Sequence, residues 1–290
     1  MSKSKILDMI NKLDQRIESL EDITVMNYKP KRFGVSISTY SNPGTPKERL
    51  KIIEKCLDSI KEQVYDKFDR DLVYINIVSD TVTDEHEKLL QKYPFSRTKN
   101  TENMGVWYTK NVGIKCILDN DCDFGFLLDD DVIINDGIVF KYYLRAIELT
   151  GYSHFTCING NERTKNTIVK NGINLRVLSN AQGFWLTFTR KGIEKTGYFN
   201  KMPYKAGYEH SLFAEKNIIF GEIPHRVDII RPERFLNMSY IFNFSTSSTN
   251  PGSYKEAKIN TDIGRNLHNV IEFFELDLDK TIIHNNSGDP

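Results

Sequence analysis

The stretch of sequence that decides the fold is Phe126-Leu127-Leu128-Asp129-Asp130-Asp131-Val132. An apolar run over residues 124–128 is followed directly by three carboxylates, a pattern typical of a buried strand that ends at a polar edge. Adjacent carboxylates repel one another unless a cation neutralises them, and their oxygens are ligands that suit Mg2+ or Mn2+. The triplet by itself is equally compatible with a metal site and with a solvated acidic turn.

The three aspartates are not expected to act alike. Alternate side chains of an extended segment point to the same side, so Asp129 and Asp131 are predicted to face the metal. Asp130 is predicted to be turned away from the metal, in a structural role.

Two earlier apolar segments, residues 33–40 and 72–78, indicate strands that also end in polar residues. Amphipathic segments predict helices over residues 46–60, 83–92, 106–118 and 137–149. This alternation predicts an α/β fold, a mostly parallel Rossmann-like sheet with helices on its faces. Ligands of such sheets bind outside the carboxyl ends of the strands, so Thr39, Asp80 and the triplet are predicted to share one edge.

The second half of the chain has a more mixed pattern. Strands are predicted at residues 153–158, 173–178 and 183–189, partly antiparallel, with a polar stretch between the first two. A further helix is predicted at residues 208–217.

The N-terminal segment has apolar side chains at helical spacing over residues 4–21, namely Ile6, Met9, Ile10, Leu13, Ile17 and Leu20. This pattern predicts an amphipathic helix that packs on the body or mediates homo-oligomer formation. We divide the chain into this helical appendage (1–30), a body (31–230, with halves 31–132 and 133–230) and a C-terminal accessory or lid segment with its tail (231–290).

Composition excludes several classes of protein. The 290 residues contain 39 basic and 39 acidic side chains, which argues against non-specific nucleic-acid binding. The apolar runs are strand-sized, so neither a signal peptide nor a transmembrane segment is expected. We therefore expect a cytoplasmic protein, either free or at the cytosolic face of a membrane. The four cysteines have no metal-binding spacing.

The order of the motifs supplies more information than any one of them. After Ser38-Thr39-Tyr40 and Val78-Ser79-Asp80 come Asn103-Met104-Gly105, Lys110-Asn111-Val112-Gly113-Ile114, the aspartate triplet and finally Gly207-Tyr208-Glu209-His210-Ser211-Leu212. This order resembles the GT-A nucleotide-diphospho-sugar transferases, most closely glycosyltransferase family 2, over residues 33–230.

The resemblance implies roles for residues that bind the donor. Thr39 and Tyr40 would line the nucleotide base, and Asp80 would accept a hydrogen bond from it, typically from N3–H of uracil. Asn103 and Gly105 would lie beside the ribose and diphosphate, with Lys110 nearby. The family often has arginine at the position of Lys110, and lysine keeps a phosphate contact without its bidentate geometry.

The resemblance also assigns the metal motif. Asp129 would begin the family's Asp-x-Asp motif and Asp131 would end it, with Mn2+ or Mg2+ as cofactor. Asp129 and Asp130 are also counted among the contacts to the nucleotide-sugar. His225 stands where some GT-A enzymes have a third metal ligand, and the opposing interpretation is an ordinary surface histidine.

The catalytic base is where this sequence departs from the family. The family's Glu-Asp pair corresponds to Glu209-His210, so the base is either the glutamate or the histidine. Trp185 and Tyr208 are candidate acceptor contacts, and the opposing interpretation of Trp185 is a core residue.

The resemblance implies a hexosyl- or glycosyltransferase of class EC 2.4. It would transfer a sugar from a UDP-sugar to a hydroxyl of a glycan or other acceptor, with metal dependence and inversion. One alternative is a non-catalytic nucleotide-sugar or carbohydrate-binding protein of the same fold. A sugar nucleotidyltransferase is the other alternative, although residues 41–47 lack the glycine-rich basic loop expected there.

Overall fold

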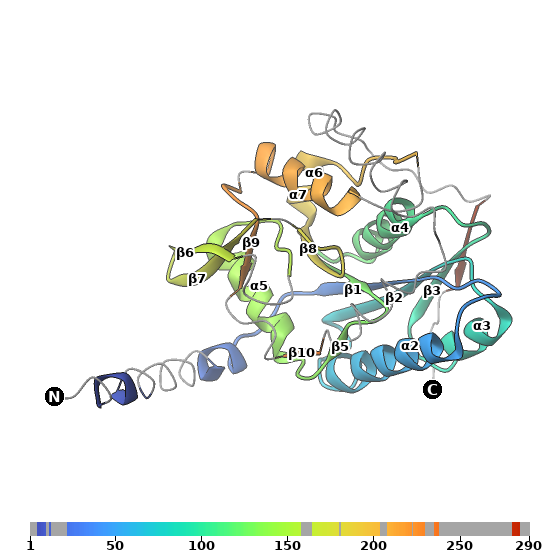
Figure 1. Cartoon of the computed structure of the whole chain (residues 1–290), viewed down its shortest axis with the longest axis horizontal. Coiled ribbons are helices and arrows are strands. Elements are labelled where there is room, and N and C mark those ends of the chain that lie inside the picture. The colour runs from blue at the N-terminus through green and yellow to red at the C-terminus, as the bar shows by residue number, and fades with distance from the viewer. Residues whose placement is uncertain are drawn as a thin grey trace.

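The computed structural model describes residues 5–9, 12, 22–157, 164–179, 181–203, 208–221, 223–229, 235–237 and 280–284. Their main feature is a six-stranded sheet with the order β11-β3-β2-β1-β4-β8 (Figure 1). The parallel strands are β1 (Phe33–Thr39), β2 (Val73–Asp80), β3 (Ser96–Asn100) and β4 (Phe124–Asp129). The antiparallel strands at the two edges are β8 (Trp185–Thr189) and β11 (Thr281–His284).

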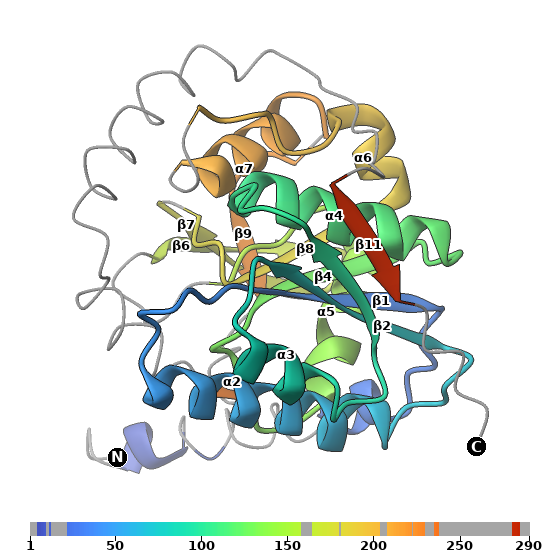
Figure 2. The same ribbon diagram turned by 90° about the vertical axis from the view of Figure 1, so that its right-hand side faces the viewer.

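Helices cover both faces of this sheet. On one face lie α2 (Lys47–Ile60), which continues as the π-helix η1 (Lys61–Tyr65), α3 (Asp84–Leu90) and α5 (Ile138–Thr150) (Figure 2). On the other lie α4 (Val106–Asp119), α6 (Arg190–Thr196) and α7 (Glu209–Ile219). The predicted α/β fold class is therefore confirmed.

Strand β1 shows why the layers pack as they do. Phe33, Val35 and Ile37 alternate along it and join the core cluster on the α2 and α5 face. Gly34 and Ser36 face α4 instead, where space is short: a Cβ at Gly34 would lie 2.5 Å from the Ile117 side chain. Small residues therefore let α4 approach the strand closely.

Two smaller sheets complete the second half. One contains β6 (Thr164–Lys170), β7 (Ile173–Leu178) and β9 (Val227–Ile229), and the other pairs β5 (Ile133–Ile134) with β10 (Leu236–Asn237). The strand predicted at 153–158 is wrong, because its described part forms only an isolated bridge between Thr156 and Leu186. Part of the polar stretch is strand β6, which sequence patterning missed because its side chains are largely exposed.

Short segments near both ends of the chain are among the described residues. Residues 236–237 and 281–284, from the segment predicted to be an accessory or lid, pair with β5 and β3. Residues 5–9 are helical and expose Ile6, Leu7 and Met9. Most of the predicted N-terminal helix, the polar segment 243–253 and the last six residues lie outside the described residues. Homo-oligomer formation stays a prediction. None of the helices that the structure describes is both long and apolar enough to span a bilayer.

A buried histidine connects β8 with α7. His154 Nδ1 donates a hydrogen bond to the carbonyl oxygen of Thr187 at 2.7 Å, and its ring packs edge-on against Phe213. Burial, with a smaller contribution from Arg226, lowers the pKa of His154 to about 4. The imidazole is therefore neutral in the fold.

This burial makes stability depend on pH. The unfolded chain binds a proton at His154 near its ordinary pKa of 6.5 and the folded chain does not, so stability falls as the pH falls from 6.5 towards 4. Between pH 7 and pH 5 we expect a loss of about 2 kcal/mol from this residue. Urea unfolding of the wild type and of His154→Gln at both pH values tests this, because the variant should lose less stability on acidification. Equal losses in the two proteins would contradict the prediction.

Candidate functional site

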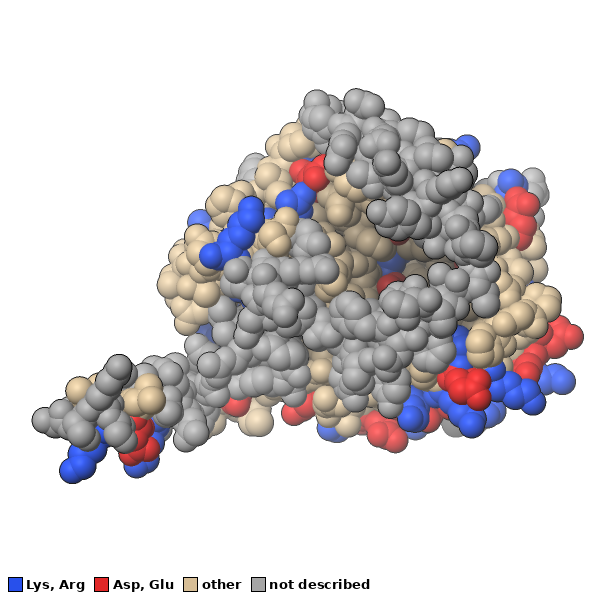
Figure 3. All heavy atoms as spheres, in the orientation of Figure 1, with Lys and Arg blue, Asp and Glu red and all other residues tan. Residues whose placement is uncertain are grey.

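The carboxyl ends of three adjacent strands form the edge on which the candidate site is built. Strand β1 lies between β2 and β4, with Thr39 paired to Ser79 and Ser38 paired to Asp129. The strand endings therefore come together as the sequence predicts. On the face seen in Figure 3 the surface is hollowed, and acidic and basic side chains are visible in the depth of the hollow.

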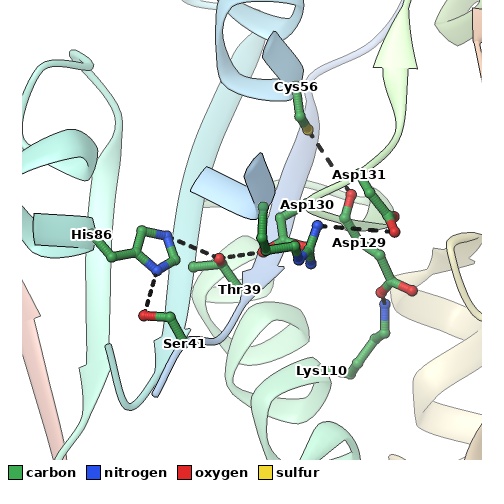
Figure 4. A network of polar contacts seen from close by, with 9 residues as sticks. Thr39, Ser41, Cys56, His86, Lys110, Asp129, Asp130 and Asp131 are labelled. Carbon is green, nitrogen blue, oxygen red and sulfur yellow. Dashed lines mark hydrogen bonds and ion pairs between the residues drawn. The ribbon is translucent and has the colours of Figure 1, made fainter. Parts of the chain in front are cut away.

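Asp130 is enclosed in the fold. Its side chain is 3% exposed, Arg49 of α2 binds Oδ1, and the Thr39 hydroxyl donates to Oδ2 (Figure 4). The predicted division of the triplet agrees with this geometry, since Asp130 is turned inward. A direct contact of Asp130 with the nucleotide-sugar does not fit, because both carboxylate oxygens are already bound inside the protein.

A chain of hydrogen bonds continues from Asp130. The Thr39 hydroxyl proton goes to Asp130, so Thr39 accepts from Nε2–H of His86 at 3.2 Å. Burial lowers the pKa of His86, and in the neutral ring Nδ1 accepts from the Ser41 hydroxyl at 2.9 Å. The Thr39 hydroxyl is thus bonded inside the protein, whereas Tyr40 is 40% exposed; the contact of both residues with a base stays a prediction.

Asp129 has a different partner. The Lys110 ammonium, buried in α4, donates to Asp129 Oδ1 at 2.6 Å and to the carbonyl oxygen of Gly183 at 3.0 Å. The Asp129 side chain itself is 38% exposed. Lys110 therefore neutralises a carboxylate from below, which differs from the predicted open contact with a phosphate.

Asp131 is the least compensated of the three. Its side chain is 15% exposed, Oδ1 has no hydrogen-bond partner among the described residues, and Oδ2 lies 4.0 Å from Arg49 Nη1. Burial and then the charges of Asp130 and Asp129 raise the pKa of Asp131 to about 7, against the opposing effect of Arg49. A carboxylate in this position is one that a bound cation stabilises.

The donor set fits a divalent cation held jointly by protein and ligand. Within the part of the chain that the structure describes, no group of three or more His, Cys, Asp or Glu side chains is assembled around one point. His225 therefore does not join Asp129 and Asp131 here, and its side chain is exposed. Mg2+ commonly takes one or two carboxylates plus substrate phosphates, which matches Asp129 and Asp131 at the carboxyl edge of the sheet.

Asp80 organises the start of α4. Its carboxylate accepts hydrogen bonds from Met104 N at 2.7 Å, Gly105 N at 2.8 Å and Asn100 Nδ2 at 3.0 Å. Gly105 caps α4 with a φ of 89°, a conformation that favours glycine. These bonds use both oxygens of Asp80, so a bond to the base stays a prediction. Asn103 is half-buried in the same turn.

The candidate base lies next to this site. Glu209 is buried at the start of α7, and its Oε1 lies 3.0 Å from His210 Nε2. The His210 side chain is 24% exposed and its ring covers Gly183, where a Cβ would lie 2.0 Å from His210 Cε1. Because the carbonyl of Gly183 also binds Lys110, this glycine connects the candidate base to Asp129.

The two acceptor candidates differ in placement. Trp185 is fully buried, and its ring packs against those of Phe126, Phe140 and Tyr143. A place on a sugar face does not fit it, and the core interpretation holds. Tyr208 is half-buried with a φ of 68°, and its hydroxyl donates to Glu215.

Three residues of the site were missed in the sequence. Arg49 and His86 each interrupt the apolar face of a helix, at spacings of four from Ile53 and from Leu90. A charged or polar residue on such a face is a signal of a buried polar contact. Gly183 carries no comparable signal, because only the fold brings His210 against it.

Known proteins give an independent comparison. No protein-family model matches this chain. It is 29% identical over 222 residues to a protein named "Uncharacterized glycosyltransferase R363" from Acanthamoeba polyphaga mimivirus, a match that covers 74% of this chain and 84% of that protein. The resemblance to glycosyltransferases indicated by the motifs is thereby confirmed.

Similar solved structures include the mannosyltransferase PcManGT from Pyrobaculum calidifontis in complex with GDP-Man and Mn2+, with a TM-score of 0.49 and 17% identity. That match covers 69% of this chain and 58% of the mannosyltransferase. S. aureus TarS has a TM-score of 0.47 and 19% identity, over 64% of this chain and 33% of TarS. The chain thus spans little more than half of the first protein and a third of the second.

The packing of His210 on Gly183 gives a direct test of the site's geometry. Gly183→Ala should destabilise the protein by about 1–3 kcal/mol, because the new methyl group overlaps the imidazole. The same substitution made in His210→Ala should cost much less. Thermal or urea unfolding of the four proteins measures this difference. A Gly183→Ala cost that is the same in both backgrounds would contradict the placement of His210.

Proposed function

We propose that this chain is a metal-dependent glycosyltransferase that transfers a sugar from a UDP-sugar to an acceptor hydroxyl, with inversion at the anomeric carbon. The observation that carries the proposal is the arrangement of Asp129 and Asp131 on either side of a neutralised Asp130, at the carboxyl edge of parallel strands. The similarity to a viral protein named as a glycosyltransferase supports the same class of activity.

Asp129 and Asp131 would hold Mn2+ or Mg2+ at this edge. When bound, the ion supplies electrostatic stabilisation of the charge that develops on the departing nucleoside diphosphate. Asp80 accepts hydrogen bonds from the backbone N–H groups of Met104 and Gly105 and so fixes the turn before α4, beside which the donor would bind. The exposed ring of Tyr40 would contact the uracil base.

His210 is the more exposed of the two candidate bases, with 24% of its side chain accessible against 3% for Glu209. Glu209 is buried and its Oε1 lies 3.0 Å from Nε2 of His210, so its charge favours the tautomer with the proton on Nε2 and leaves Nδ1 as the basic nitrogen of the ring. Nδ1 is enclosed and has no hydrogen-bond partner among the described residues. Catalysis would require the imidazole to turn so that Nδ1 reaches the acceptor. The acceptor O–H proton would then pass to Nδ1 as the acceptor oxygen bonds to the anomeric carbon. The bond from that carbon to the diphosphate oxygen breaks, and its electron pair leaves with the nucleoside diphosphate. Glu209 would then stabilise the imidazolium, as a carboxylate behind a catalytic histidine does.

The metal assignment predicts strong effects of single amide substitutions. Asp129→Asn and Asp131→Asn should each lower Mn2+-dependent release of UDP from a UDP-sugar by about 100-fold or more, with the fold intact. Asp123→Asn is a matched control, since this exposed aspartate precedes β4 at its opposite end. A donor panel of UDP- and GDP-sugars with Mn2+ supplies the assay. Unchanged turnover in both variants would refute the assignment of Asp129 and Asp131 as metal ligands.

The base assignment predicts a different pattern of kinetic loss. His210→Ala should lower kcat by about 100-fold to 10,000-fold, as expected for removal of a general base, while UDP affinity stays near that of the wild type. Glu209→Gln should give a smaller loss, because the imidazole is retained. Binding by calorimetry and turnover by UDP release separate the two effects. Near-normal rates in both variants would assign the base elsewhere. Donor binding without turnover in the wild type would favour the non-catalytic alternative.

A further inference from the structure

Arg49 is a second fixed cation of the candidate donor site. It lies in the first turn of α2, its side chain is largely buried, and it binds Asp130 Oδ1. Its Nη1 lies 4.0 Å from Asp131 Oδ2, too far for a hydrogen bond but close enough for a strong Coulombic interaction. One guanidinium therefore acts on two members of the triplet in different ways.

Asp130, the partner of Arg49, is held in place by further hydrogen bonds. Thr39 holds the other oxygen of Asp130, and His86 and Ser41 hold Thr39 in turn. These bonds come from β1, the following loop and α3, so the pair is fixed from several elements (Figure 4). The charge of Arg49 is therefore held at this edge by the protein itself.

The charges around the edge can be counted from the described residues. With Asp131 ionised, the three carboxylates of the triplet face two cations, Arg49 and Lys110, which gives −3 + 2 = −1. A divalent cation changes this to −1 + 2 = +1, the sign that attracts a diphosphate. Without Arg49 the same sums are −2 before the metal and 0 after it.

We propose that Arg49 sets the charge of the donor site, so that the carboxylates of Asp129 and Asp131 bind a bare cation weakly and the loaded site binds the donor's diphosphate more tightly. This inference rests on the proposed function, because it takes Asp129 and Asp131 as the metal ligands. It assigns Arg49 a positioning and selectivity role: the residue acts through the metal site and does not touch the substrate.

The proposal predicts shifts of opposite sign when the charge is removed. Arg49→Gln should bind Mn2+ alone about tenfold more tightly and, at saturating Mn2+, should bind UDP about tenfold more weakly, given the size of Coulombic effects at this range. Structural damage would instead weaken both. Arg49→Lys keeps the charge and should retain affinities near those of the wild type.

Two further variants make the test sharper. Arg190→Gln is the matched control, because this arginine pairs with Asp123 at the far end of β4 and should change neither affinity. The double variant Arg49→Gln/Asp130→Asn removes both charges of the buried pair and restores the net charge. Both affinities should therefore return towards the wild type, and this variant also decides the matter if Arg49→Gln alone fails to fold.

Electron paramagnetic resonance of free Mn2+ measures the first affinity, and calorimetry with UDP at saturating Mn2+ measures the second. Shifts of the same sign in Arg49→Gln would overturn the proposal, as would unchanged affinities in that folded variant. A double variant that does not return towards the wild type would overturn it too. A wild-type protein that binds no Mn2+ with or without UDP would refute the proposed metal site itself, which is a separate failure.

Discussion

The enclosure of the Asp130 carboxylate by Arg49 and Thr39 is the constraint on which the carboxyl edge of the sheet depends. A buried carboxylate is costly unless it is paired and hydrogen-bonded, and here both oxygens are satisfied from two other elements. The pair connects β4 to α2 and β1 at the point where the strands end. It also fixes which way the neighbouring aspartates face.

The site has a second set of connections on the side of α4. Lys110 binds both Asp129 and the backbone of Gly183, and the imidazole of His210 packs on the same glycine. Residues separated by about a hundred positions in the chain are thereby brought together around a single backbone segment. Through these contacts Asp129 is paired with Lys110. Asp131, in contrast, has no hydrogen bond to its Oδ1 among the described residues. Two carboxylates together with substrate phosphates are a ligand set that Mg2+ commonly takes.

Much of the sheet and its helices could be predicted from sequence because the pattern of buried apolar residues is strong there. The strands β1, β2 and β4 are almost wholly buried, and α2 and α5 have clear apolar faces. Strand β3 could not be predicted in this way, because the residues Ser96–Asn100 are polar and β11 covers its edge from nearly two hundred residues away.

The candidate site was predictable only in part. Asp129, Asp130 and Asp131 follow from local geometry, since alternation along extended backbone separates the middle carboxylate from its neighbours. The partners of these carboxylates are set by tertiary contacts, so the roles of Lys110 and Thr39 could not be taken from spacing. Trp185 shows the same limit, because a tryptophan beside a site and one beneath it look alike in sequence.

The most direct measurement of the central claim is the affinity of the wild-type protein for UDP with Mn2+ and with EDTA, by calorimetry. If Asp129 and Asp131 share a divalent ion with the donor's phosphates, UDP should bind at least about tenfold more tightly with Mn2+, and Mn2+ should bind more tightly with UDP by the same factor. Equal affinity for UDP in Mn2+ and in EDTA would contradict the account.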